Sequence, residues 1–121
     1  MNDDERVSRG MTVRREVLGD EHVDRAVAAT TDVTADFQDL ITRYAWGEIW
    51  SRPGLARRDR SIAVISSLIA LHHWEELEMH LRAALTNGLS RDEIIEVILQ
   101  SAVYAGVPAA NRAFAIANEL F

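Results

Sequence analysis

Cysteine and lysine are both missing from this sequence of 121 residues, and each absence excludes a group of mechanisms. Without cysteine there are no disulfides, no thiolate metal sites and no thiol-based redox reactions. All 13 cationic side chains are arginines, so a Schiff-base lysine and the lysine of a nucleotide-binding P-loop are excluded as well. Proline and glycine are sparse, with two and six residues, so we expect few breaks in the regular structure.

Length, charge and hydropathy limit the class of protein. A chain of 121 residues fits one compact domain, which we predict to span residues 1–121 and to bury a core of its own. A net charge of −6 argues against nucleic acid as a partner. The most apolar window, residues 62–71, falls well short of the roughly 20 residues that a membrane-spanning helix needs. The acidic first ten residues do not resemble a signal peptide, so we expect a cytoplasmic protein with no membrane partner.

The spacing of apolar residues predicts an all-α fold, a single compact domain of about seven helices without strands. The first three expected helices cover residues 3–18, residues 21–29, and a stretch that is capped within 30–32 and ends before residue 52. The next two cover residues 57–72 and a stretch that ends at Asn87-Gly88. The last two run from the capping box at Ser90 to Gly106, and from around Pro108 to Phe121. The helix over 57–72 is apolar on nearly all sides, which is typical of a central, buried helix.

Two glycines, Gly10 and Gly47, lie inside predicted helices, where each costs about 1 kcal/mol relative to alanine. Gly47 is the more informative of the two, because it lies between Trp46 and Trp50. Such a glycine either permits a close approach of the backbone to another backbone or to a ligand, or it marks the end of a helix. The sequence favours neither interpretation.

A cluster of polar side chains on one predicted helix is a candidate for chemistry. His73, Glu76 and His80 share one helix face, and Leu77 and Leu81 flank it, so we expect this face to point inward. Three interpretations remain open. They are an acid–base site with a histidine oriented by a carboxylate, a metal site of two histidines and one glutamate, and a helix face with no chemical role.

Arginines gather around the start of the helix predicted over 57–72, at positions 52, 57, 58 and 60. Guanidinium groups beside a helix N-terminus can bind an anion, so we expect at least one of them to hold a carboxylate. For any one of these arginines alone, a solvated turn is the better interpretation. The nearby Trp46 and Trp50 are more typical of a core than of a cofactor pocket.

Segments along nearly the whole chain carry a family resemblance. They are RREVLG from residue 14, WGEIWSRPGL from residue 46, ELEMHLRAA from residue 76 and YAGVPAAN from residue 104. Together they resemble the carboxymuconolactone decarboxylase family, within the alkylhydroperoxidase D-like superfamily of helical proteins. The peroxidases of that superfamily use two cysteines, a histidine and an upstream glutamate, and this chain has His73, Glu76, His80 and Ser61 at those positions. Peroxidase chemistry is therefore excluded.

The resemblance implies an enzyme that decarboxylates a small dicarboxylate lactone, 4-carboxymuconolactone, to the β-ketoadipate enol-lactone in bacterial protocatechuate catabolism. In that reaction the lactone itself accepts the electrons of the broken bond, so we expect no cofactor and no metal. The resemblance also implies a homo-oligomer, a trimer or a hexamer. The alternatives are a metal-dependent hydrolase of a small lactone that uses His73, Glu76 and His80, and a helical oligomeric scaffold without activity.

The same resemblance suggests roles for particular residues. His80 is the expected proton donor or oxyanion stabiliser, and Glu48 or Glu76 is the expected partner that orients it. The expected substrate-binding residues are an arginine that clamps the carboxylate, Arg52 or Arg60, and the pocket residues Trp46, Trp50 and His73.

Overall fold

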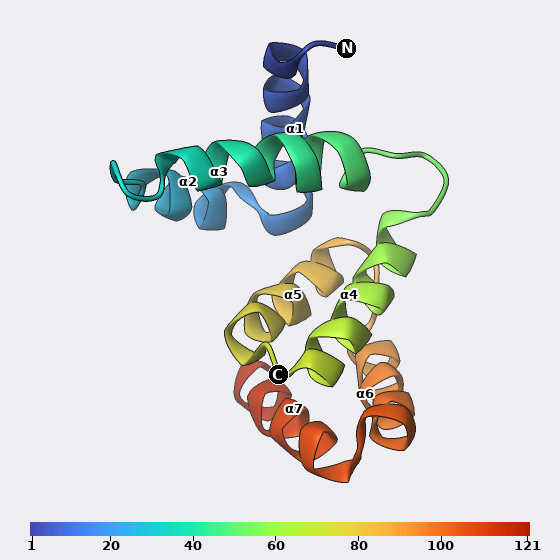
Figure 1. The fold of residues 1–121 in the computed structure, drawn as a ribbon. Helices are drawn as coiled ribbons and strands as arrows, with labels where there is room; N and C mark the ends of the chain where they lie inside the picture. Colours follow the sequence, from blue (N-terminus) through green and yellow to red (C-terminus); the bar gives the residue numbers. More distant parts are fainter. The chain divides into compact units, whose positions relative to one another are not determined.

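The computed structural model describes all 121 residues and contains seven α-helices, one π-helical segment and no strand. The helices are α1 (Asp3–Leu18), α2 (Asp20–Ala28), α3 (Ala35–Ile41), the π-helix η1 (Thr42–Trp50), α4 (Arg57–Leu71), α5 (Trp74–Thr86), α6 (Arg91–Ala105) and α7 (Val107–Leu120). The predicted all-α fold is confirmed. Contacts divide the chain into two compact units, residues 1–55 and 56–121 (Figure 1).

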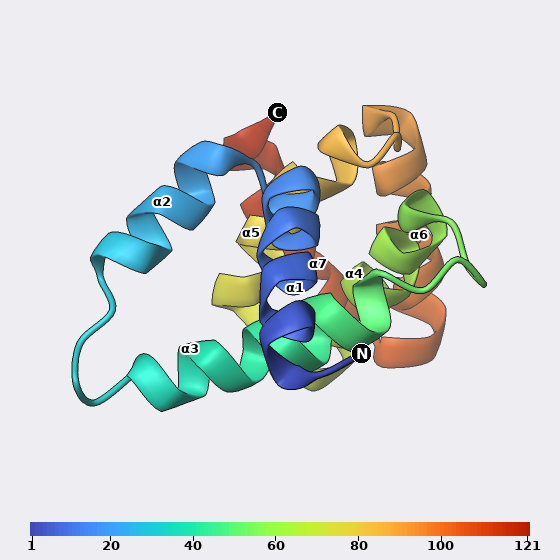
Figure 2. The same ribbon diagram turned by 90° about the horizontal axis from the view of Figure 1, so that it is seen from above.

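In the first unit, α1 packs along η1, and α2 packs against α1. The predicted bounds of α1 agree with the structure, because the chain supplies clear local signals at both ends. The Asn2 side chain accepts a hydrogen bond of 2.9 Å from the Glu5 amide, and Gly19 ends the helix with a φ of 90°. Figure 2 shows α3 and η1 as one continuous rod.

The second half of this rod is a π-helix, which the sequence did not predict. The rod also starts later than expected, at Ala35, with Thr34 as its N-cap. Hydroxyl groups bond to backbone carbonyls around the π segment: Thr42 Oγ1 donates to the Gln38 carbonyl over 2.7 Å, and Ser51 Oγ donates to the Gly47 carbonyl over 2.7 Å. Segments with i→i+5 hydrogen bonds are rare and are frequent at functional sites.

The two helix glycines lie where α1 and η1 meet. A Cβ atom on Gly10 would lie 2.1 Å from the Thr42 carbonyl oxygen, and one on Gly47 would lie 2.4 Å from the Arg6 carbonyl oxygen. Both distances are far below van der Waals contact, and both neighbours are backbone atoms. The structure therefore favours the interpretation of close backbone approach at Gly47 over that of a helix end.

In the second unit, α4, α5, α6 and α7 surround an apolar core (Figure 1). The core residues come from all four helices and the turn before α6: Ile65, Ile69, Leu77, Leu81, Ala84, Leu89, Ile94, Ile98, Ala109, Ala110, Ala113 and Ala117. The predicted capping box at Ser90 is confirmed, because Ser90 and Glu93 bond reciprocally. Alanines on α7 allow this helix to lie close to its neighbours.

The expectation that residues 57–72 form a fully buried helix is wrong. Only Ser61, Ile65 and Ile69 of α4 are buried, and Leu71 is 65% exposed. These buried positions are four residues apart, so α4 is an ordinary amphipathic helix with one inward face. No helix of the structure is long and apolar enough to cross a membrane.

Candidate active site

Both units contain predicted site residues. The first unit holds Trp46, Glu48, Trp50 and Arg52, and the second unit holds Arg60, His73, Glu76 and His80. Each unit thus presents its own set of candidate groups.

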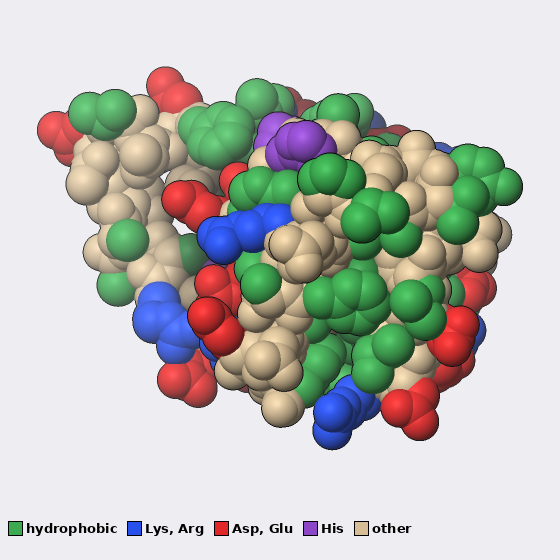
Figure 3. Space-filling view, turned by 90° about the horizontal axis from the view of Figure 1, so that it is seen from below, with side chains coloured by type: hydrophobic (Ala, Val, Ile, Leu, Met, Phe, Trp, Pro, Cys, Tyr) green, Lys and Arg blue, Asp and Glu red, His purple; other side chains and the backbone are tan.

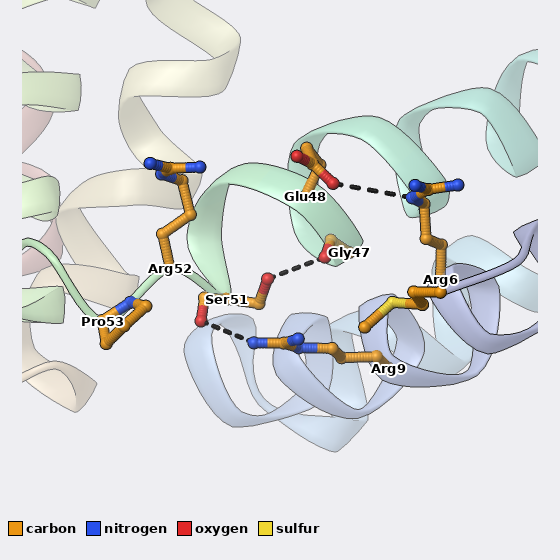
Figure 4. A pocket seen from close by; sticks show the side chains of 8 residues that line it. Arg6, Arg9, Gly47, Glu48, Ser51, Arg52 and Pro53 are labelled. Carbon is orange, nitrogen blue, oxygen red and sulfur yellow. Dashed lines mark hydrogen bonds and ion pairs between the residues drawn. The ribbon is translucent and has the colours of Figure 1, made fainter.

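A pocket of about 280 Å³ lies in the first unit, where α1 meets η1 and the turn that follows (Figure 4). Its lining includes Arg6 and Arg9 from α1, Glu48 from η1 and Arg52 from the turn. We call it the arginine pocket. Its volume is close to the lower end of the range for small-molecule sites.

Polar contacts hold Arg6 and Arg9 in this pocket. Arg9 Nη2 donates to the Ser51 carbonyl oxygen over 3.0 Å, and Arg6 Nε lies 3.5 Å from Glu48 Oε2 (Figure 4). The lining side chains include three guanidinium groups and one carboxylate. The excess of positive charge suits a small anion such as a carboxylate.

Sequence analysis identified Arg52 and Glu48 in this pocket but missed Arg6 and Arg9. These two lie about 40 residues upstream, and nothing in their local spacing distinguishes them from solvated helix residues. The pairing of Gly10 with Gly47 was the available signal, because two glycines at which backbones meet place α1 beside η1. That contact places Arg6 and Arg9 next to residues 47–52.

Trp46 and Trp50 stack on each other next to this pocket, within η1. Their ring centroids are 5.3 Å apart with an interplanar angle of 27°, and the residues are only 6% and 8% exposed. This burial agrees with the prediction that both are more typical of a core than of a cofactor pocket. The stacked indoles lie on η1 on either side of Glu48 in the sequence and help to fix the conformation of this segment.

In the second unit, the His80 side chain is buried, as the predicted inward face requires. It lies on α5 and is 8% exposed. On α4, Arg60 is half-buried and Ser61 is fully buried. Asn87 Nδ2 donates to Ser61 Oγ over 3.0 Å, so the residue that ends α5 holds the Ser61 side chain.

The prediction that His73, Glu76 and His80 share an inward face is wrong for the first two. His73 is the N-cap residue of α5 and is exposed, and Glu76 is exposed in the first turn. His72 adopts φ 61° at the end of α4 and stacks on Trp74. Helical spacing placed the three side chains on one side, but the chain turns at His73, so only His80 points into the unit.

The metal-site interpretation of these residues depends on the same inward face. No group of three or more histidine, aspartate or glutamate side chains in the structure has an arrangement that could hold a metal ion. His73, Glu76 and His80 therefore do not form the ligand set that a metal-dependent hydrolase would need.

A buried cation in the first unit was not among the predicted residues. Arg14 on α1 is 6% exposed, and its Nη1 donates to Gln38 Oε1 over 3.3 Å. Burial, together with the nearby charge of Arg15, lowers the pKa of the Arg14 guanidinium. Burial and the charges of Arg25 and Arg14 also lower the pKa of His22.

The lowered pKa of His22 predicts a dependence of stability on pH. Because the folded state disfavours the charged imidazole, the unfolded chain binds the proton more readily, and stability falls as the pH drops below about 6.5. We expect His22→Gln to lose less unfolding free energy than the unmodified chain between pH 7 and pH 5. Urea titrations at both pH values measure this, and equal losses in the two proteins would contradict it.

Comparison with known proteins connects these features to a family. The pattern of the "Carboxymuconolactone decarboxylase family" matches residues 35–119. A 4-carboxymuconolactone decarboxylase of Acinetobacter baylyi is 50% identical over 121 residues, which cover all of this chain and 90% of that protein. The nitrosuccinic acid decarboxylase of Metarhizium robertsii is 41% identical over 110 residues, covering 91% of this chain and 77% of that protein. The chain therefore belongs to the carboxymuconolactone decarboxylase family.

Proposed function

We propose that this chain removes CO₂ from 4-carboxymuconolactone and forms the β-ketoadipate enol-lactone, as a carboxy-lyase of protocatechuate catabolism. The observation that carries this proposal is the 50% identity, over the whole chain, with a relative that bears the name of this activity. A second 4-carboxymuconolactone decarboxylase, from Pseudomonas putida, is 48% identical over 48 residues, which are all of that sequence and 40% of this chain.

The chemistry fits a protein without lysine or cysteine. When the bond from the ring γ carbon to the carboxylate breaks, its electron pair forms a double bond to the β carbon. The former ring double bond shifts toward the lactone carbonyl, whose oxygen becomes an enolate. A proton then adds to the α carbon and gives the enol-lactone. The substrate accepts its own electrons, so the protein needs to bind the anion, stabilise the enolate oxygen and deliver one proton.

For anion binding we propose the arginine pocket, with Arg52 as the clamp for the carboxylate that is retained. Its excess of guanidinium groups supports this role, and Arg52 lines the pocket from the turn that follows η1. Glu48 is paired with Arg6, so we assign it the positioning of that guanidinium rather than a proton transfer. Trp46 and Trp50 are buried and are not among the residues that line the pocket, so we assign them to the core and not to substrate binding.

For the proton we propose His80. An imidazole is the side chain whose pKa lies nearest to neutral pH, and burial keeps competing water away from it. Glu76 is exposed on the first turn of α5, and His73 caps that helix, so neither is favoured as its partner or as a substrate ligand. Arg60 is the runner-up to Arg52 as the carboxylate clamp.

The two relatives together suggest a substrate class. In 4-carboxymuconolactone the carbon that loses CO₂ also carries an acetate arm, so the molecule contains a succinate skeleton. Nitrosuccinic acid, for which the Metarhizium robertsii relative is named, has the same skeleton with a nitro group in place of the lactone. In each acid an electron acceptor is attached to, or conjugated with, the carbon that loses CO₂. We propose that the site accepts succinates that are substituted in this way at carbon 2.

A proton NMR time course in D₂O tests the activity. The assay contains 4-carboxymuconolactone, with and without EDTA, and a parallel sample contains nitrosuccinate. We expect loss of CO₂ from the lactone, deuterium at the ring carbon α to the carbonyl, and no effect of EDTA. Slower turnover of nitrosuccinate would support the wider substrate class.

Other outcomes of this time course distinguish the alternatives. Ring opening without loss of CO₂, abolished by EDTA, would indicate a metal-dependent lactone hydrolase. No change in either substrate, from a folded protein, would indicate a scaffold without activity. Either result would overturn the proposal.

Arg52→Met tests the assignment of the clamp. A lost charge-assisted hydrogen bond to a carboxylate corresponds to a rise in KM of roughly 10- to 100-fold, with a smaller change in kcat. Steady-state kinetics measure both constants, and Arg91→Met, an exposed arginine at the start of α6, is the matched control. An unchanged KM for Arg52→Met together with a raised KM for Arg60→Met would move the clamp to Arg60.

We also propose that the protein acts in the cytoplasm as a homo-oligomer, a trimer or a hexamer. Exposed apolar side chains support the oligomer, and Figure 3 shows such side chains in green on one face. Among the largest of them in the second unit are Val103, Tyr104 and Val107, each more than 70% exposed. Sedimentation at the monomer mass would contradict this part of the proposal.

A further inference from the structure

Arg14 is the buried charged side chain of the first unit, and the proposed decarboxylation does not use it. The residue is only 6% exposed, and its one hydrogen bond, from Nη1 to Gln38 Oε1, goes to a neutral amide over 3.3 Å. Its Nε is buried and has no hydrogen-bond partner. A charge that is removed from water without an opposite charge beside it is unfavourable, so the position of Arg14 needs an explanation.

Other arginines of the same unit do have carboxylates beside them. Four of them form ion pairs with aspartate or glutamate: Arg6, Arg15, Arg25 and Arg43. Their side chains are between 31% and 65% exposed, so solvent already screens these charges. The opposite would be expected if pairing served stability alone, because a buried cation gains most from a carboxylate.

The groups around Arg14 add positive charge and N–H donors. Its side chain extends from α1 to Gln38 on α3, and α1, α2 and the rod of α3 and η1 lie as three sides of a triangle in Figure 2. His22 on α2 is half-buried, and the charges of Arg25 and Arg14 both lower the pKa of its imidazole. The charge that lowers the pKa of Arg14 is that of Arg15. Arginines alone therefore supply the charges that shift these two groups.

We propose that Arg14, Gln38 and His22 form an anion site that binds the carboxylate of a small organic acid. A guanidinium matches a carboxylate in shape and charge, and the side-chain N–H groups of the amide and the imidazole add further donors. The bound carboxylate supplies the negative charge that the unit itself does not place beside Arg14. None of the three residues lines the arginine pocket, so this is a second site.

A titration with succinate, followed by NMR through the ring C–H signals of His22, tests the proposal on the unmodified protein. The His22→Gln variant identifies these signals among those of the four histidines. We expect a saturable shift and a rise in the pKa of His22, because a bound carboxylate stabilises the imidazolium. The charges that act on this imidazole, those of Arg14 and Arg25, stay constant near neutral pH. Signals that respond only as they do to sodium chloride of equal ionic strength would overturn the site.

Two arginine variants show which guanidinium is responsible. Arg14→Met should abolish the response of His22 to succinate. Arg15→Met removes the neighbouring cation, which is paired with Asp20 and Asp24, and should keep the response. A response in folded Arg14→Met equal to that of the unmodified chain would overturn the assignment.

Stability without succinate separates a binding role from a structural one. In a buffer free of oxyanions, Arg14→Met should unfold at the same temperature as the unmodified chain or at a higher one, because the variant no longer buries an unpaired charge. Added succinate should raise the unfolding temperature of the Arg15→Met protein and leave that of Arg14→Met unchanged. A large loss of stability in Arg14→Met, with no gain from succinate in the unmodified chain, would mean that the guanidinium is purely structural.

Kinetics with 4-carboxymuconolactone distinguish two sources of the carboxylate. If the substrate supplies it, succinate inhibits competitively and Arg14→Met raises KM roughly tenfold. If another acid supplies it, KM stays unchanged, and His22 still responds to succinate while the lactone is bound. Either result supports the site, and only the first depends on the proposed function. Because the NMR titration needs no turnover, an inactive protein whose His22 signals respond would overturn the decarboxylation and leave the anion site in place.

Discussion

Replacing His80 by alanine should lower kcat for decarboxylation by about 10²- to 10⁴-fold, the usual contribution of a positioned general acid. The imidazole is 8% exposed on α5, so bulk water is a poor substitute for it as proton donor within the site. In D₂O the variant should also incorporate deuterium on both faces of the α carbon, because the dienolate would then be protonated after its release into solution. Steady-state kinetics and the NMR time course measure these two effects.

The neighbouring histidines provide matched controls for this prediction. His72→Ala removes an exposed imidazole at the end of α4 and His73→Ala one at the N-cap of α5, and both variants should keep kcat within about twofold. Thermal unfolding of all three variants separates loss of activity from loss of structure. Turnover near the original rate in a folded His80→Ala protein would remove His80 from the mechanism.

Gly47→Ala should destabilise the first unit by about 3 kcal/mol or more, which is the upper part of the range for overpacked sites. The new Cβ would lie 2.4 Å from the Arg6 carbonyl oxygen, and that backbone atom belongs to a helix that cannot move without losing its contact with η1. Tryptophan fluorescence in a Trp74→Phe background reports on Trp46 and Trp50 alone, so it follows unfolding of this unit.

Two further glycine variants calibrate this result. Gly10→Ala should reproduce the loss, since its Cβ would lie 2.1 Å from the Thr42 carbonyl oxygen. Gly54→Ala is the control, because no atom lies within 4 Å of the Cβ that it would add and its φ lies outside the left-handed region. Equal stability of the Gly47 and Gly54 variants would show that α1 and η1 are not in backbone contact.

Helices and their ends were predictable because their signals are local. Asn2 and Ser90 cap the residues that follow them within three positions, and Gly19 and Gly106 end helices through a positive φ. These features depend on hydrogen bonds between near neighbours, so the sequence displays them directly. The burial of His80 was also predictable, because it shares a helix face with Leu77 and Leu81.

Features that depend on contacts between distant segments were not predictable in the same way. Helical spacing treats His73 as part of α5, whereas the chain bends there and exposes it together with Glu76. The arginine pocket draws Arg6 and Arg9 from another helix, and their own neighbours in sequence contain no trace of it. The π-helix was missed because its apolar pattern resembles that of an α-helix.

The π geometry of η1 makes the arginine pocket sensitive to the number of residues per turn in this segment as well as to their identity. A ring closed by an i→i+5 hydrogen bond contains one residue more than an α-helical ring. Substitutions that let Thr42–Trp50 relax into an α-helix without a change in length would remove one residue from each hydrogen-bonded ring. Every later residue would then turn around the axis relative to α1, since an α-helix has 3.6 residues per turn and a π-helix has more. Ser51 and Arg52 would move away from Arg9, and the pocket would be dismantled although each of its side chains was still present.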